Sequence, residues 1–292
     1  MFIATLVAET LGSGQLSDAA DKLADAGCRP GPWRWLENGR AADLEFAAQP
    51  DLARGALEGA FTVTDVIVQT AAKREKKLLV ADMDSTMITV ECIDELADYA
   101  GIKAQIAEVT ERAMRGELDF GAALDARVGL LKNLDESAID RCLAERVRDS
   151  VGAETLVKTM AARGATTVLV SGGFTRFAGP VGERLGFQRV IANVLEINAG
   201  KLTGTVTKPI VDSATKETTL LAVRAELGLA PEQTLAVGDG ANDLAMIRQA
   251  GLGVAYRAKP IVAAAAGARV DHTDLATLLY AQGIPREEWL AA

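Results

Sequence analysis

Three apolar segments, each ending in a short turn of polar and small residues, constrain the fold of this chain most strongly. They cover residues 78–82, 167–171 and 234–238, and helical patterns separate them. Parallel strands need such crossover helices, so the pattern predicts an α/β fold with a doubly wound parallel sheet. Ligands bind at the carboxyl ends of the strands in such sheets, and we therefore expect the chemistry in these three turns.

A long insertion separates the first and second of these strands. It runs for roughly eighty residues, which is far longer than one crossover connection. Its helical patterns fall at residues 93–99, 104–115, 120–131 and 136–148. We expect an inserted helical cap at about residues 93–150, lying over the site.

The first 72 residues have a different order of elements. Strand patterns and helical patterns alternate as βαββαβ, which suits a small α+β ferredoxin-like sandwich. The strands are expected at residues 2–7, 33–36, 41–46 and 65–68, and the helices at 17–26 and 51–59. The basic stretch at 73–77 is interpreted as a solvated linker. We therefore divide the chain into residues 1–72 and 73–292.

Charge and residue usage exclude several classes of function. The 40 acidic and 31 basic residues give a net charge of −9, which argues against a general affinity for nucleic acid or anionic membranes and favours small-molecule partners. The only histidine, His272, excludes a mechanism with two histidines, and we expect it to be structural or peripheral. The three cysteines are interpreted as reduced, buried thiols. The chain start reads as a strand rather than a signal peptide, and we expect a cytoplasmic protein.

The first turn contains two carboxylates two positions apart, Asp82 and Asp84. In an extended strand such positions face the same side, so both groups would lie beside one reacting atom. Their repulsion is tolerated if a divalent cation binds, or if one carboxyl stays protonated as a general acid. A DxD pair also occurs in metal-dependent glycosyltransferases and in plain surface turns.

The second turn places Ser171 before Gly172 and Gly173. A hydroxyl and accessible backbone N–H groups can cradle a phosphate or an oxyanion, although an ordinary glycine turn has the same sequence.

The third turn places Asp239, Asn242 and Asp243 in a glycine-rich strand end. Hard cations such as Mg²⁺ take oxygen ligands of this kind. Lys216 precedes this turn in a polar segment, where it either offsets negative charge at the site or lies on the surface.

Together these segments resemble the haloacid dehalogenase superfamily of phosphatases and, within it, the phosphoserine phosphatase family. The resemblance covers residues 76–280. It rests on VADMDSTMITVECIDELA, EVTERAMRGELDF, SGGFT, VLEINAGKLTG and VGDGANDLAMIRQAGLGVAYRAKP.

The resemblance implies a hydrolase that works through an aspartyl-phosphate. Asp82 would be the nucleophile and Asp84 the general acid and base. Mg²⁺ would be held by Asp82, the backbone carbonyl of Asp84 and Asp239, with Asp243 nearby. The phosphoryl group would be held, or the nucleophile oriented, by Ser171, Gly172, Lys216 and Asn242.

The resemblance also assigns the substrate pocket to the cap. Glu91 and Arg127 would bind the amino and carboxylate groups of phosphoserine, with Met114 and Phe120 as apolar cover. As single residues, Glu91 and Arg127 are equally typical of a helix surface. The activity implied is the hydrolysis of phosphoserine, the last step of serine biosynthesis.

Three alternatives stay open at this point. A related phosphatase or phosphotransferase acting on another small phosphomonoester would share every core residue. A regulatory amino-acid-binding protein with an inactive core is the alternative from another class.

The N-terminal region resembles an ACT-type amino-acid-sensing domain, in which Gly12 and Gly14 form either a ligand loop or a plain turn. Whether serine inhibits and whether the chain forms a homodimer are left undecided.

Overall fold

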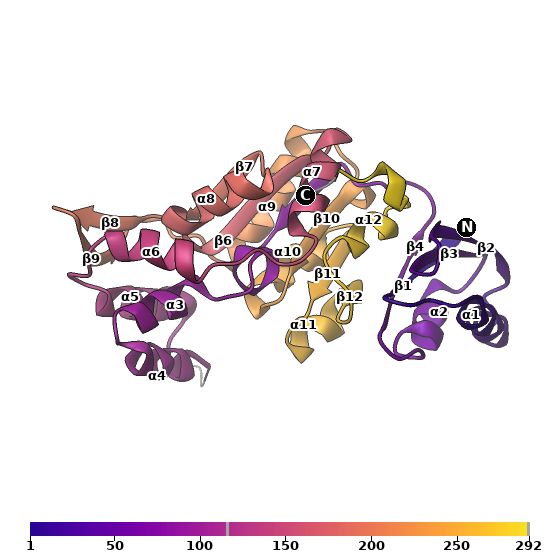
Figure 1. The fold of residues 1–292 in the computed structure, drawn as a ribbon, viewed down its shortest axis with the longest axis horizontal. Coiled ribbons are helices and arrows are strands. Elements are labelled where there is room, and N and C mark those ends of the chain that lie inside the picture. The colour runs from indigo at the N-terminus through magenta and orange to yellow at the C-terminus, as the bar shows by residue number, and fades with distance from the viewer. Residues whose placement is uncertain (115–116, 291–292) are drawn as a thin grey trace.

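The computed structural model describes residues 1–114 and 117–290. It contains a four-stranded sheet near the N-terminus, a six-stranded sheet and a two-stranded hairpin (Figure 1). Within the described residues, no helix combines the length and the apolar character that crossing a membrane requires.

The N-terminal sheet is built as the sequence predicts, in the order βαββαβ. Its strand order is β2-β3-β1-β4, with β1 antiparallel to both neighbours. Side chains of both helices share one core with one face of the sheet, because alternate residues of β1 such as Ala4 and Leu6 point toward them. The elements are β1 (Phe2–Ala8), α1 (Ser13–Asp25), β2 (Pro30–Glu37), β3 (Ala41–Phe46), α2 (Pro50–Leu57) and β4 (Thr64–Thr70).

The first helix begins earlier than predicted. Helix α1 starts at Ser13, directly after Gly12. Gly14 therefore lies in its first turn and not in a loop, which leaves only Gly12 at the strand–helix junction. The Gln15 side chain accepts a hydrogen bond from the Gly12 backbone N–H at 2.9 Å, and this contact fixes the helix start.

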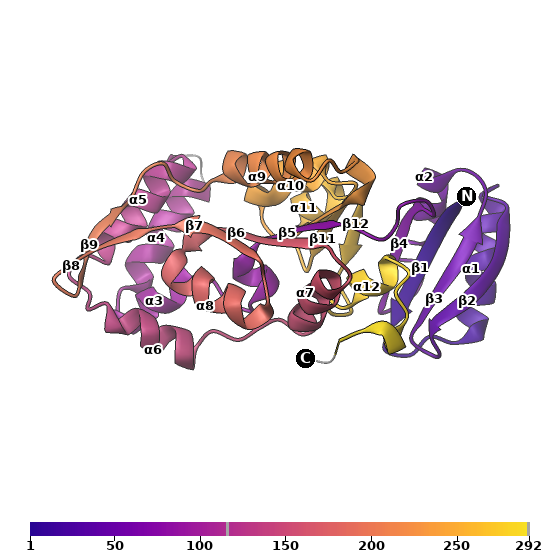
Figure 2. The same cartoon turned by 90° about the horizontal axis from the view of Figure 1, so that it is seen from above.

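The larger sheet is parallel and doubly wound, as expected. Its strand order is β12-β11-β10-β5-β6-β7, and every neighbouring pair is parallel. Helices α7, α8 and α12 pack on one face, and α9 and α10 pack on the other (Figure 2). The strands are β5 (Leu78–Ala81), β6 (Thr166–Phe174), β7 (Arg189–Asn193), β10 (Thr234–Gly238), β11 (Leu252–Tyr256) and β12 (Ala268–Val270). The helices are α7 (Ala153–Ala162), α8 (Thr175–Leu185), α9 (Ser213–Glu226), α10 (Leu244–Gln249), α11 (Pro260–Ala265) and α12 (Thr277–Ala281).

Four helices form the insertion between β5 and β6. They are α3 (Cys92–Tyr99), α4 (Lys103–Met114), α5 (Phe120–Leu130) and α6 (Ser137–Glu145), close to the predicted positions. The hairpin of β8 (Leu195–Asn198) and β9 (Lys201–Val206) was not expected. It reaches from the large sheet to the insertion, where the Asn133 N–H donates to the Leu202 carbonyl at 2.9 Å. Short helical turns occur at Met83–Met87, Pro231–Gln233, Ala241–Asp243 and Arg286–Glu288.

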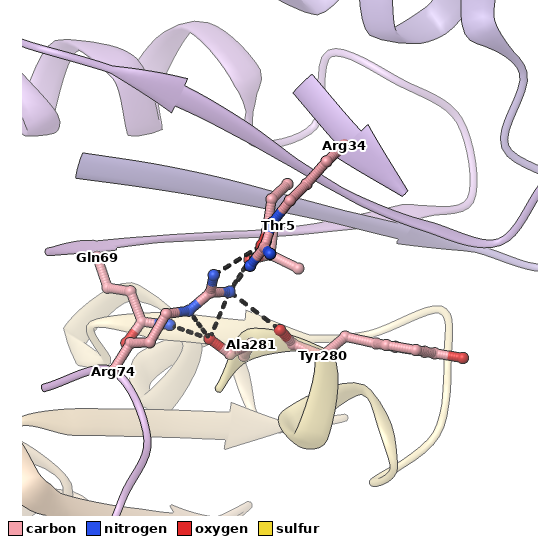
Figure 3. Close-up of polar contacts among 7 residues, drawn as sticks. Thr5, Arg34, Gln69, Arg74, Tyr280 and Ala281 are labelled. Carbon is pink, nitrogen blue, oxygen red and sulfur yellow. Dashed lines mark hydrogen bonds and ion pairs between the residues drawn. The ribbon is translucent and has the colours of Figure 1, made fainter. Parts of the chain in front are cut away.

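The interpretation of residues 73–77 as a solvated linker is wrong. Arg74 and Lys76 are buried, because the linker runs between the two sheets rather than through solvent. The Arg74 guanidinium donates to both carboxylate oxygens of Asp43, at 2.7 and 2.9 Å. It also donates to the hydroxyl of Thr5 and to the carbonyls of Tyr280 and Ala281 (Figure 3). The division at residues 72 and 73 stays a prediction. The contact across it is buried and combines these polar groups with an apolar cluster of Val7, Leu36, Ala41 and Tyr280.

We expect Arg74→Met to destabilise the protein by about 3 kcal/mol, because it leaves the buried Asp43 carboxylate without its main partner. The matched control is Arg34→Met. Arg34 also pairs with Asp43, at 3.2 Å, but its side chain is 61% exposed, so we expect a loss below about 1 kcal/mol. Urea unfolding of both variants measures the difference. Equal losses would contradict the account.

Candidate active site

The three predicted turns meet under the helical insertion, at the carboxyl ends of β5, β6 and β10. They enclose a cavity of about 630 Å³ between the large sheet and the cap. The cavity lining includes eight of the predicted site residues, namely Asp82, Asp84, Glu91, Phe120, Arg127, Gly172, Asp239 and Asn242.

Asp82 and Asp84 leave β5 in extended conformation. The backbone then turns at Ser85, which has a φ of 55°. The Asp84 carboxylate accepts hydrogen bonds from the Cys92 backbone N–H at 2.8 Å and from the Ser171 hydroxyl at 3.2 Å. Burial and the nearby Glu91 carboxylate raise the pKa of Asp84 to about 6. Asp84 is therefore held in place, and a larger fraction of it carries a proton near neutral pH than of an ordinary aspartate.

Lys216 is completely buried and bridges two carboxylates. Its ammonium group donates to Asp82 and, at 2.6 Å, to Asp243. Burial alone would lower the pKa of Lys216, but the two carboxylates more than offset this and raise it. Asp212 begins helix α9 by accepting the Thr215 N–H at 2.8 Å, and this cap fixes the turn that carries Lys216.

Three carboxylates lie close enough to share one metal ion. Oxygen atoms of Asp82, Asp239 and Asp243 are all within 4.8 Å of one another. Burial and Asp243 raise the pKa of Asp239 to about 6, and burial and Asp243 also raise the pKa of Asp82. Several oxygen ligands suit a hard divalent cation such as Mg²⁺. The Lys216 ammonium group offsets part of their negative charge. The Asp84 carboxylate accepts hydrogen bonds from Cys92 and Ser171, so the backbone carbonyl of Asp84 is left as the predicted metal ligand.

The glycines of the second turn allow close packing around Asp84. A Cβ atom on Gly173 would lie 2.7 Å from the Asp84 carboxylate, and one on Gly172 would lie 3.2 Å from the Phe120 ring. The Gly173 N–H donates to the Ser171 hydroxyl at 2.9 Å. Side chains larger than hydrogen would therefore displace the acid or the ring.

Asn193 is a positioning residue that sequence reasoning missed. Its side chain donates to the Gly172 carbonyl at 2.8 Å and accepts the Val211 N–H at 2.7 Å. It thus ties the glycine turn to the segment that leads into α9 and Lys216. A single asparagine at a strand end gives no sequence signal for this role.

The cap contributes two acids, Glu91 and Asp94, and the base Arg127 to the cavity, and of these Glu91 and Arg127 were predicted. The Ser85 hydroxyl donates to Glu91 at 2.7 Å. The half-buried Arg127 donates from Nε to the Ala123 carbonyl at 3.3 Å, and among the described residues no carboxylate lies within 4.0 Å of its nitrogens. Burial lowers the pKa of Arg127, although Asp94 and Glu91 oppose this effect. The guanidinium is therefore available to a ligand.

Some cavity residues were not predicted, and three predicted site residues, Ser171, Lys216 and Asp243, do not line the cavity. Asp94 and Lys259 line it; both lie in segments that carry the family resemblance, but neither was singled out as a site residue. The Met114 side chain lies outside the described part of the chain. His272 is far along the chain, in a loop where its backbone N–H donates to Asp65 at 3.2 Å, which agrees with a peripheral role.

A family model described as haloacid dehalogenase-like hydrolase matches residues 79–248, more than half of the chain. The chain belongs to this family. The match begins in β5 and ends in α10, so it includes every turn of the candidate site and the whole cap.

Relatives within the haloacid dehalogenase-like hydrolases include proteins named phosphoserine phosphatase. The one from Streptomyces coelicolor is 48% identical over 239 residues, which is 81% of this chain but only 58% of that protein. The one from Albidiferax ferrireducens is 46% identical over 208 residues, or 70% of this chain and 88% of that protein. The Streptomyces protein is thus considerably longer than the segment matched.

Solved structures resemble both parts of the chain. A haloacid dehalogenase (HAD) family hydrolase from Salmonella enterica serovar Typhi superposes on this chain with a TM-score of 0.86 at 28% identity. The superposition covers 99% of this chain and 100% of that one. A phosphoserine phosphatase structure described as a phospho-aspartyl intermediate analogue gives a TM-score of 0.65 at 37% identity, covering 70% of this chain and 98% of its own.

We expect Mg²⁺ to stabilise the protein through the three-carboxylate group. At about one hundred times the dissociation constant the gain should be about 2.7 kcal/mol. Asp239→Asn should remove most of this gain, because it deletes one charged ligand. Asp125→Asn, which removes an exposed carboxylate paired with Lys208, should keep it. Thermal unfolding with Mg²⁺ and with EDTA measures both, and an unchanged gain in Asp239→Asn would contradict the assignment.

Proposed function

We propose that this chain is a phosphoserine phosphatase that hydrolyses O-phospho-L-serine to L-serine and phosphate. The observation that carries the proposal is the placement of Lys216 between Asp82 and Asp243, below a cavity whose cap side presents Arg127 and Glu91. The phosphoserine phosphatases among the relatives support the same activity. The proposal extends to the last step of serine biosynthesis. It also extends to the cytoplasm, for which the three free, buried cysteines are typical.

In the first step, an oxygen of the Asp82 carboxylate attacks phosphorus. A bond from phosphorus to Asp82 forms and the bond from phosphorus to the serine oxygen breaks. Asp84 donates its proton to the departing serine oxygen, which makes serine a neutral leaving group. The raised pKa of Asp84 suits this role, because the acid must carry a proton near neutral pH.

In the second step, water hydrolyses the aspartyl-phosphate. Asp84 accepts a proton from the water as the water oxygen bonds to phosphorus, and the bond to Asp82 breaks. Phosphate leaves, and both carboxyl groups return to their starting states. One acid–base residue thus serves both steps, and no histidine is needed.

The phosphoryl group needs positive charge and hydrogen-bond donors. Lys216 supplies the charge from below, and we propose that Ser171, the Gly172 N–H and Asn242 supply the donors or orient the nucleophile. Asp82, Asp239, Asp243 and the Asp84 backbone carbonyl would hold Mg²⁺. When bound, Mg²⁺ would neutralise charge on the transferring phosphoryl group.

The serine part of the substrate would lie against the cap. Arg127 would bind the carboxylate as a two-pronged donor and Glu91 would bind the ammonium group. Phe120 would exclude water above Gly172, and the Met114 side chain would add to this cover. These four residues determine which phosphomonoester is accepted, because the turns below them contact only the phosphoryl group.

Asp82→Asn should abolish turnover while the protein stays folded, because an amide oxygen is a far weaker nucleophile than a carboxylate. We expect a fall in kcat of at least about 10⁴-fold. Phosphate release measures kcat, and circular dichroism checks the fold. A variant with more than a tenth of the parent activity would rule out Asp82 as the nucleophile.

Arg127→Ala should lower kcat/KM for phosphoserine by about 10- to 100-fold, the value of charged hydrogen bonds to a carboxylate. It should change kcat/KM for phosphoethanolamine, which has no carboxylate, by less than about threefold. Arg141→Ala, which alters an exposed arginine of the cap, is the control. A panel that adds phosphothreonine and sugar phosphates tests the substrate itself. Equal rates across the panel would reduce the assignment to a general phosphatase.

A further inference from the structure

Asp65 lies in the N-terminal sheet, yet it organises a loop of the catalytic part of the chain. It is buried in β4, and its carboxylate accepts backbone N–H groups from three consecutive residues of the loop. The distances are 2.8 Å for Asp271, 3.2 Å for His272 and 2.8 Å for Thr273. The Thr273 hydroxyl adds a fourth bond at 2.5 Å. A carboxylate with four donors from one loop fixes the shape of that loop.

The same loop, residues 271–276, packs against Gly152, the residue directly before α7. The Leu275 N–H donates to the Val151 carbonyl at 3.2 Å. Gly152 has a φ of +80°, and a Cβ atom there would lie 2.5 Å from the Ala276 nitrogen and 2.6 Å from the Asp274 carboxylate. The loop therefore packs closely against the backbone of Gly152 and leaves no room for a side chain there. Helices α7 and α12, which flank this contact, lie next to each other in Figure 2.

Val151 and Gly152 lie at the end of one of the two chain segments that connect the cap to the large sheet. The outgoing and returning segments pair as short antiparallel strands at Ile88 and Asp149. The Thr89 N–H donates to the Arg148 carbonyl, and the Ser150 N–H donates to the Met87 carbonyl, both at 2.9 Å. We call residues 87–89 and 148–152 the cap connection.

The cap connection, together with the β8–β9 hairpin, joins the two halves of the cavity. Arg127 and Glu91 belong to the cap, whereas Asp82 directly follows β5 and Lys216 lies in α9. Substrate held by the cap reaches the nucleophile only if this connection keeps one geometry. A change of about 1 Å in such an alignment is enough to affect catalysis.

We propose that Asp65 is a positioning residue for the active site, which acts from the N-terminal sheet through the 271–276 loop on the cap connection. The N-terminal region then contributes to catalysis without touching substrate. The kinetic consequence rests on the proposed function, whereas the structural consequence does not.

Asp65→Ala tests the proposal in the full-length protein. Without the carboxylate, a smaller fraction of molecules has the aligned cap, and KM for phosphoserine should rise by about 5- to 20-fold, with kcat changed by less than about threefold. Hydrogen exchange should become at least about 10-fold faster at residues 148–153 and 271–276, but stay unchanged in β5 and β10. Asp65→Asn, which keeps one acceptor oxygen, should give an intermediate effect.

The control is Glu37→Gln, which makes the same change of charge at another contact of the N-terminal sheet, the one with α12. Glu37 accepts a hydrogen bond from the Tyr280 hydroxyl and does not touch the loop, so KM and exchange should match the parent protein. Gly152→Ala disturbs the same contact from the other side and should reproduce the Asp65→Ala phenotype if Asp65→Ala does not fold. Unchanged exchange at 148–153 in both variants would overturn the proposal. If exchange rises as expected but the parent protein does not hydrolyse phosphoserine, the proposed function fails and the positioning role stands.

Discussion

A buried lysine shared by two carboxylates is the interaction on which the site depends. Lys216 has no contact with solvent, and it is charged only because Asp82 and Asp243 surround its ammonium group. Each member of this group would be costly to bury alone. The first and third turns and helix α9 must therefore meet precisely enough for the charges to compensate, and this requirement explains why a small residue such as Gly238 is needed beside Asp243.

Buried polar contacts also join the N-terminal sheet to the rest of the chain. Arg74 and Asp43 form a second buried ion pair, at the junction between the N-terminal region and the segment before the C-terminus. Asp65 uses a different chemistry at the same junction, because it binds backbone N–H groups of a loop rather than a cation. The Arg74–Asp43 pair is one of the buried contacts that hold the two parts together, whereas Asp65 links the N-terminal sheet to the loop that packs against the cap connection.

Local patterns in the sequence predicted the parallel sheet, the cap helices and the three functional turns. These features follow from periodicity and from turn residues that lie next to one another in the chain. The burial of Arg74 could not be predicted in this way, since its partner Asp43 is 31 positions away and charged runs are usually solvated. Asn193 and Asp65 were missed for the same reason. Each acts on backbone groups of a distant segment, and a single polar residue carries no periodic signal. The β8–β9 hairpin was missed because its strands are short and its contacts are with the cap.

The most direct test of the account is to identify the residue that carries the phosphoryl group during turnover. Protein quenched in acid within milliseconds of mixing with phosphoserine, then reduced with borohydride and digested, can be mapped by mass spectrometry. The account predicts a labelled peptide in which Asp82 alone is modified, and no label when Mg²⁺ is removed with EDTA. A phosphoryl group on any other residue, or complete turnover with no acid-stable phosphoprotein at any time, would contradict it.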